Sequence, residues 1–80
     1  MNQTILDFVK FGGSWIIRGS FWITTEKGPS PRIVYWFDDG LNTEWIEHKA
    51  RYTAKRFATQ QEATVFAEEN AERLERAMPK

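Results

Sequence analysis

Residues 14–25 read SWIIRGSFWITT, and this stretch decides which fold the chain can adopt. It is rich in aromatic and β-branched residues, which favour the pleated, half-buried surface of a strand. We therefore expect one long strand with a bulge or bend at Gly19, or two shorter strands divided there. With a period of two, one side is apolar and the other is mixed. The apolar side holds Trp15, Ile17, Gly19, Phe21 and Ile23, and the mixed side holds Ile16, Arg18, Ser20, Trp22 and Thr24.

Turn-forming residues divide the middle of the chain into shorter strands. Residues 26–31 read EKGPSP, and we expect a loop there because two prolines and a glycine do not fit a central strand. Residues 32–37 form the second expected strand, and Asp38-Asp39-Gly40 is the turn that follows it. Residues 42–47 fit a third strand, and residues 50–57 fit a fourth strand or an extended lead-in to the C-terminal segment.

The N-terminal segment, residues 4–11, fits two kinds of secondary structure. A short helix would begin near Thr4, with Asp7 in a weak capping box, and would end at Gly12-Gly13. A strand would place Ile5, Asp7 and Val9 on one side. We favour the helix.

The C-terminal segment carries the strongest helical pattern in the chain. Thr59 is a good N-cap, and Glu62 occupies the capping-box position three residues later. Small and apolar residues then recur at steps of three and four, and Pro79 would end the helix. We expect one amphipathic helix over about residues 60–78, with ion pairs Glu69–Arg73 and Glu72–Arg76 on its outer face.

These elements predict a single α+β domain that spans residues 1–80, since a chain of this length forms one domain. The expected architecture is a three- or four-stranded antiparallel β-meander with one C-terminal α-helix packed on one face, and with a short N-terminal helix. Short connections favour antiparallel neighbours. We expect the helix to cover the face that carries Ile17, Phe21, Ile23, Ile33, Tyr35 and Phe37.

Composition excludes several classes of protein. Lys and Arg number 11 and Asp and Glu number 11, so the zero net charge excludes polybasic proteins and acidic DNA mimics that work by bulk charge. The chain has no cysteine, and therefore no disulfide or thiol nucleophile. No apolar run approaches the length that spans a membrane, and no signal peptide is visible. We expect a cytoplasmic protein without a membrane partner.

Signs of an enzyme are nearly absent from the sequence. No phosphate loop, dinucleotide fingerprint or nucleophile elbow occurs. Acidic residues and the single histidine do gather between residues 38 and 48, where they resemble ligands of a divalent metal. Asp38 and Asp39 are more simply read as turn residues, and Glu47 and His48 as residues of a strand edge. We predict no catalytic, metal or cofactor site.

The sheet face opposite the helix is the first candidate for a binding surface. Trp22 and Trp36 would lie there on neighbouring strands, with Arg32 and Arg18 beside them. Exposed apolar patches on small proteins mark interaction sites, and tryptophan is frequent among binding hot spots. We therefore expect a non-enzymatic protein-binding module, or a homodimer that pairs through this face. The alternative is that residues 4–11 fold over the face and bury it.

A cluster of basic residues in the sequence suggests nucleic-acid binding as an alternative function. No acid lies between Glu47 and Glu62, where Lys49, Arg51, Lys55 and Arg56 occur beside a histidine. An aromatic sheet face with a basic rim is a way to bind single-stranded nucleic acid. The simpler interpretation of these charges is a solvated surface.

One pattern resembles a known group of proteins. Residues 35–40 read YWFDDG, Trp45 follows, and residues 54–63 read AKRFATQQEA. Together these are similar to small proteins of phages and mobile elements, in which a hairpin leads to an A-x-x-F-x-T-x-x-E-A entry into a C-terminal helix. Anti-CRISPR and anti-restriction proteins include several of this build. The resemblance implies stoichiometric binding to a host or defence protein.

Overall fold

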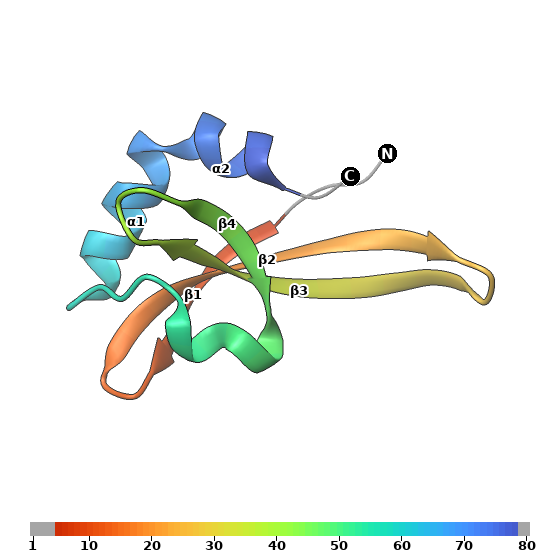
Figure 1. Ribbon diagram of the computed structural model, residues 1–80, viewed down its shortest axis with the longest axis horizontal. Helices are drawn as coiled ribbons and strands as arrows, with labels where there is room; N and C mark the ends of the chain where they lie inside the picture. Colours follow the sequence, from red (N-terminus) through yellow and green to blue (C-terminus); the bar gives the residue numbers. More distant parts are fainter. Residues whose placement is uncertain (1–4, 79–80) are drawn as a thin grey trace.

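A four-stranded antiparallel sheet is the frame of the structure, a computed structural model that describes residues 5–78 (Figure 1). Each strand pairs with the next along the chain, as the predicted meander requires. The strands are β1 (Ile5–Phe11), β2 (Ser14–Thr25), β3 (Gly28–Asp38) and β4 (Thr43–Glu47). A 3₁₀-helix, η1 (His48–Thr53), and two C-terminal helices, α1 (Gln60–Glu69) and α2 (Ala71–Ala77), complete the α+β domain.

The N-terminal segment is a strand, so the helix expected there is wrong. Phe8 pairs with Ile17, and Phe11 with Ser14. Gly12 and Gly13 both adopt positive φ, at 57° and 82°, which is the backbone of a tight two-residue hairpin turn. The glycines therefore close a hairpin instead of ending a helix. Thr4 and Pro79, suggested as helix boundaries by the sequence, lie outside the described residues.

The register between β2 and β3 differs from the expected one. Thr25 pairs with Gly28, so only two residues separate the strands, and Arg18 pairs with Tyr35. The helix-covered face of β2 is therefore continued on β3 by Val34 and Trp36, and the expectation that Ile33, Tyr35 and Phe37 lie there is wrong. A shift of one residue moves every side chain of a strand to the other face.

Pro29 and Pro31 belong to β3, although a loop was expected there. β4 pairs only with residues 34–38 of β3, and β1 only with residues 14–20 of β2. Within the described part of the chain, the prolines therefore lie in an edge strand, where a missing N–H is tolerated. Residues 21–33 form a two-stranded hairpin that projects from the body of the molecule (Figure 1), and we call it the hairpin arm.

The main core lies between the sheet and the C-terminal helices. Trp36 is fully buried, and its ring meets that of Trp45 edge-on, with centroids 5.2 Å apart. Nε1 of Trp45 donates a hydrogen bond to the carbonyl oxygen of Leu74 at 2.9 Å, which fixes α2 to the sheet. The other buried members of this core are Ile17, Phe21, Phe57, Ala63, Ala67 and Met78.

Gly19 lies under this core in regular pairing with Leu6 and Val34, so β2 is one continuous strand without the expected bulge. Absence of a side chain at Gly19 makes room for Met78 and for the ring of Trp45.

The C-terminal segment begins as predicted but is interrupted. Oγ1 of Thr59 accepts a hydrogen bond from the backbone N–H of Glu62 at 3.1 Å, which confirms the cap. The single long helix is wrong, because α1 ends at Glu69 and Asn70 separates it from α2. Nδ2 of Asn70 donates to the carbonyl oxygen of Phe66 at 2.8 Å, and a local side-chain bond of this kind competes with the helical backbone.

A second, smaller core lies on the opposite face of the sheet. Residues 48–54 cover it, and Ala54 packs against Ile16 and Tyr35. Residues 50–57 are therefore not a strand of the sheet. This segment contacts the sheet through one isolated antiparallel bridge, between Trp15 and Phe57, in which both N···O distances are 2.8 Å.

The difference in burial between Trp36 and Trp22 predicts a large loss of stability when the first is replaced and a small loss when the second is replaced. Trp36→Ala should lower the free energy of unfolding by about 3–5 kcal/mol, since it removes a fully buried ring. Trp22→Ala, the matched control, should cost about 1 kcal/mol or less because its side chain is half exposed. Urea unfolding followed by circular dichroism measures both. Equal losses would contradict the register described above.

The close approach at Gly19 can be tested directly. In Gly19→Ala the new Cβ would lie 2.9 Å from Cε of Met78 and 3.1 Å from the ring of Trp45. Met78 can yield, whereas the ring of Trp45 is held by its hydrogen bond to α2. We expect a loss of stability of about 1–3 kcal/mol in thermal unfolding. Ser20→Ala is the control, and a Gly19→Ala variant as stable as that control would be the contrary result.

Candidate protein-binding surface

The sheet face opposite α1 and α2 has a covered half and an open half. On the open half, Ile5, Trp22 and Ile33 expose 59 %, 51 % and 45 % of their surfaces. Ser20 pairs with Ile5 on one side and Ile33 on the other, and Trp22 follows two residues later, so all three side chains share this face. We call these three residues the arm patch.

An ion pair separates the arm patch from the covered half. Nε of Arg18 donates to Oδ1 of Asp7 at 2.9 Å, and Nη2 of Arg18 donates to the other carboxylate oxygen. The hydrogen bond to Asp7 raises the pKa of Arg18, so its guanidinium stays charged. Arg18 is therefore already paired with a carboxylate of the same chain. On the covered side of this ion pair, the hydroxyl of Tyr35 lies 3.0 Å from Nδ1 of His48.

A shallow hollow of about 510 Å³ continues the arm patch along the outer edge of β3. It is lined by residues 31–34 of β3 and by residues 47–49, where β4 passes into η1. Nζ of Lys49 lies 3.5 Å from Oε2 of Glu47 at its rim. The open half therefore combines an apolar centre with a border that contains two ion pairs and the exposed Arg32.

The structure does not bring the four sequence-predicted binding residues together. Trp22 lies on the arm patch, whereas Trp36 is fully buried, so its placement on an open face is wrong. Arg32 is exposed, but it pairs with Phe21 and so points to the helix side of the sheet. Arg18 borders the patch in its ion pair with Asp7. The one-residue difference in register accounts for this separation.

The sequence-based reasoning missed two members of the arm patch. Ile33 was assigned to the buried face, and Ile5 was assigned to a helix. The position of Ile33 follows from the pairing of Thr25 with Gly28. A two-residue connection there fixes which residues of β3 lie opposite those of β2, and it places Ile33 on the same face as Trp22.

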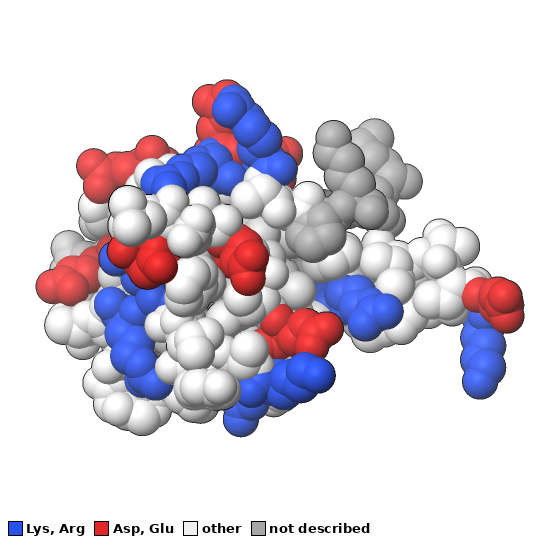
Figure 2. Space-filling model, viewed as in Figure 1, with Lys and Arg blue, Asp and Glu red and all other residues white. Residues whose placement is uncertain are grey.

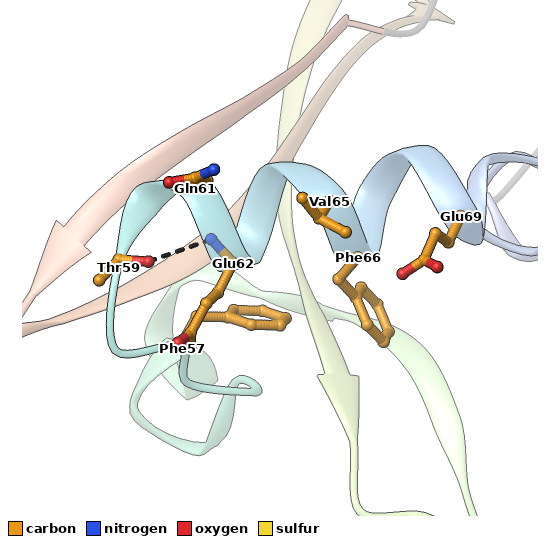
Figure 3. A pocket seen from close by; sticks show the side chains of 7 residues that line it. All are labelled: Phe57, Thr59, Gln61, Glu62, Val65, Phe66 and Glu69. Atoms are coloured by element: carbon orange, nitrogen blue, oxygen red, sulfur yellow. Dashed lines mark hydrogen bonds between the residues drawn. The ribbon is translucent and has the colours of Figure 1, made fainter.

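A second groove, of about 600 Å³, runs along α1 (Figure 3). Its floor is formed by Phe57 and Phe66, whose ring centroids are 5.2 Å apart, and the carboxylates of Glu62 and Glu69 flank the rings. Nζ of Lys55 lies 5.6 Å from the centroid of each ring. The ammonium group of Lys55 therefore already occupies the position at which these two rings would attract a cation.

Two of the acidic residues between 38 and 48, Asp38 and Asp39, accept hydrogen bonds from the backbone of their own turn. Oδ1 of Asp39 accepts hydrogen bonds from the N–H groups of Asn42 and Leu41, at 2.7 and 2.9 Å, and these bonds lower the pKa of Asp39. Oδ1 of Asp38 accepts from the N–H of Gly40. Across residues 5–78, no three His, Asp or Glu side chains gather closely enough to hold a metal ion.

The four basic residues expected to bind nucleic acid do not form one patch, because they lie at three separate positions. Lys49 lies beside Glu47, and Lys55 lies on the aromatic floor of the α1 groove. Only Arg51 and Arg56 converge, on the ring of Phe11.

Comparisons with protein-family models, with curated proteins and with solved structures each gave no match. Neither α1 nor α2, the α-helices within residues 5–78, is long and apolar enough to cross a bilayer.

Fluorescence quenching tests the exposure of the arm patch. Among the four tryptophans, only Trp22 is strongly exposed, so acrylamide should quench its emission most readily. We expect Trp22→Phe to remove most of the readily quenched emission. Trp15→Phe, at a half-buried position, should leave that fraction nearly unchanged. Quenching that is the same in both variants would show that Trp22 is covered.

Proposed function

We propose that this chain is a non-enzymatic protein-binding module that docks its arm patch onto an apolar surface of a partner protein. The observation that carries the proposal is the half-exposed indole of Trp22 on a projecting two-stranded arm. Tryptophan supplies much of the binding energy of many protein interfaces because a large flat ring becomes fully desolvated. Isolated small proteins seldom leave such groups exposed beside further apolar side chains.

The composition of the open half supports a protein as the partner. Protein interfaces have an apolar centre and a polar rim, and here Ile5 and Ile33 extend the apolar surface around Trp22. The members of the pairs Arg18–Asp7 and Lys49–Glu47 neutralise each other within the rim, and Arg32 at the edge of β3 adds one positive charge. A site for nucleic acid would instead need an excess of basic groups beside the aromatic ring. Trp36, expected from the sequence to stack on a base together with Trp22, is fully buried and inaccessible to a base.

Occlusion is the mechanism that fits this geometry. The arm patch stands on paired strands whose hydrogen bonds hold the backbone, so binding needs little ordering of the main chain. A rigid face of this kind can cover a functional site on a larger protein. The resemblance to small phage and mobile-element proteins suggests a host or defence complex as the target, with this chain acting as a modulator or inhibitor.

Site-specific photo-crosslinking tests the proposal. A benzoylphenylalanine at position 22 should crosslink one protein of the host cell, and the product should disappear when Ile33→Ser is added. The control places the same group at Val65, which is 44 % exposed on α1, and should give no such product. Circular dichroism confirms folding of each variant.

Two results would overturn the proposal of a foreign partner. One is a pattern of crosslinks that is the same at positions 22 and 65. The other is a product that forms in the purified protein alone, which would identify a second copy of this chain as the occupant of the arm patch.

A further inference from the structure

Two guanidinium groups lie on the ring of Phe11, the last residue of β1. The β1–β2 turn that follows Phe11 lies at the end of the sheet remote from the hairpin arm (Figure 1). Cζ of Arg51 is 5.3 Å from the ring centroid of Phe11, and Cζ of Arg56 is 5.1 Å from it. Residues far apart in the sequence build this arrangement, because Phe11 ends β1 whereas Arg51 lies in η1. We call Phe11, Arg51 and Arg56 the arginine cluster.

Neutral backbone carbonyls hold both guanidinium groups in place. Nη1 of Arg51 donates to the carbonyl oxygen of His48 at 2.8 Å. Arg56 donates from Nη1 to the carbonyl of Phe11 at 3.1 Å and from Nη2 to that of Tyr52 at 3.2 Å. Each guanidinium has five N–H donors, so several on each remain available for a ligand.

Among the described residues, no carboxylate forms an ion pair with the arginine cluster. The ion pairs found within residues 5–78 include neither Arg51 nor Arg56. Residues 48–61, which contain both arginines, have no acidic side chain. Figure 2 shows basic side chains along the lower left of the body, where η1 and the β1–β2 turn lie. A bound anion would supply the opposite charge that the described residues do not place against either guanidinium group.

We propose that the arginine cluster binds the phosphodiester backbone of single-stranded nucleic acid, with Tyr52 as a stacking platform for a base. A guanidinium matches the geometry of phosphate oxygens and can engage two of them at once. Tyr52 follows Arg51 in the chain, its carbonyl anchors Arg56, and 66 % of its surface is exposed. Aromatic rings bind unstacked bases of single strands, whereas bases within a duplex are not accessible to them.

This site is independent of the arm patch and concerns a different class of ligand. Trp22 lies on the arm, and the arginine cluster lies by the β1–β2 turn and η1. Only two of the four basic residues expected from the sequence converge here, and the net charge of the chain is zero. We therefore expect contacts with about two phosphates and an affinity that depends clearly but not steeply on salt.

Fluorescence anisotropy of a labelled oligothymidine of about 12 nucleotides tests the site. Two phosphate contacts predict binding about sevenfold weaker at about 200 mM than at about 50 mM salt. Arg51→Gln with Arg56→Gln should weaken binding at least tenfold and flatten its dependence on salt. Arg32→Gln with Arg73→Gln removes the same charge elsewhere and should change the affinity less than twofold. Trp22→Ala should have no effect, which separates this site from the proposed function.

Tyr52→Ala supplies a second, distinct signature. It should weaken binding about fivefold and leave the dependence on salt unchanged, because stacking releases no counterions. Three results would overturn the proposal: no binding of the oligonucleotide at about 50 mM salt, equal losses in the two double-arginine variants, or an equally tight duplex complex that Tyr52→Ala does not weaken. Thermal unfolding of each variant confirms that the fold is retained.

Discussion

The pairing of β2 with β3 through a connection of only two residues is the constraint on which the rest of the structure depends. Thr25 and Gly28 are partners, and Oγ1 of Thr25 donates to the carbonyl of Gly28 at 2.6 Å while it accepts from the N–H of Lys27. Gly28 adopts a φ of 109°, which strongly favours glycine. Lengthening or shortening this connection by one residue would exchange the two faces of β3.

Both cores follow from this register. It places Trp36 on the same face as Ile17 and Phe21, where the ring meets Trp45 and lies beneath the helices. It also places Tyr35 opposite, where η1 and Ala54 cover it. The arm patch is the continuation of that second face beyond the end of η1. The core and the candidate binding surface are therefore two consequences of a single pairing.

Local sequence signals were sufficient for some elements and insufficient for others. The strand over residues 14–25 and the cap at Thr59 depend on nearby residues alone, and both were predicted. The N-terminal strand was the less favoured of two alternatives because Gly12-Gly13 can end a helix or close a hairpin, and only pairing with β2 decides between them. Trp22 could be identified from the mixed side of its strand. The convergence of Arg51 and Arg56 on Phe11 could not, because it requires the fold to bring β1 and η1 together.

The hairpin arm shows how an apolar surface can stay exposed without self-pairing along its outer β3 edge. Pro29 and Pro31 are two residues apart, so their nitrogens face the same side of β3. That side is the one away from β2, because a proline facing β2 would remove a hydrogen bond between the two strands. Along that outer edge the arm lacks two of the N–H groups that another strand would need, a known protection against edge-to-edge association. Backbone pairing is thereby disfavoured on this side, while the side chains of Trp22 and Ile33 remain accessible. This protected edge agrees with the proposed docking function, in which exposed side chains and not backbone pairing would select the partner.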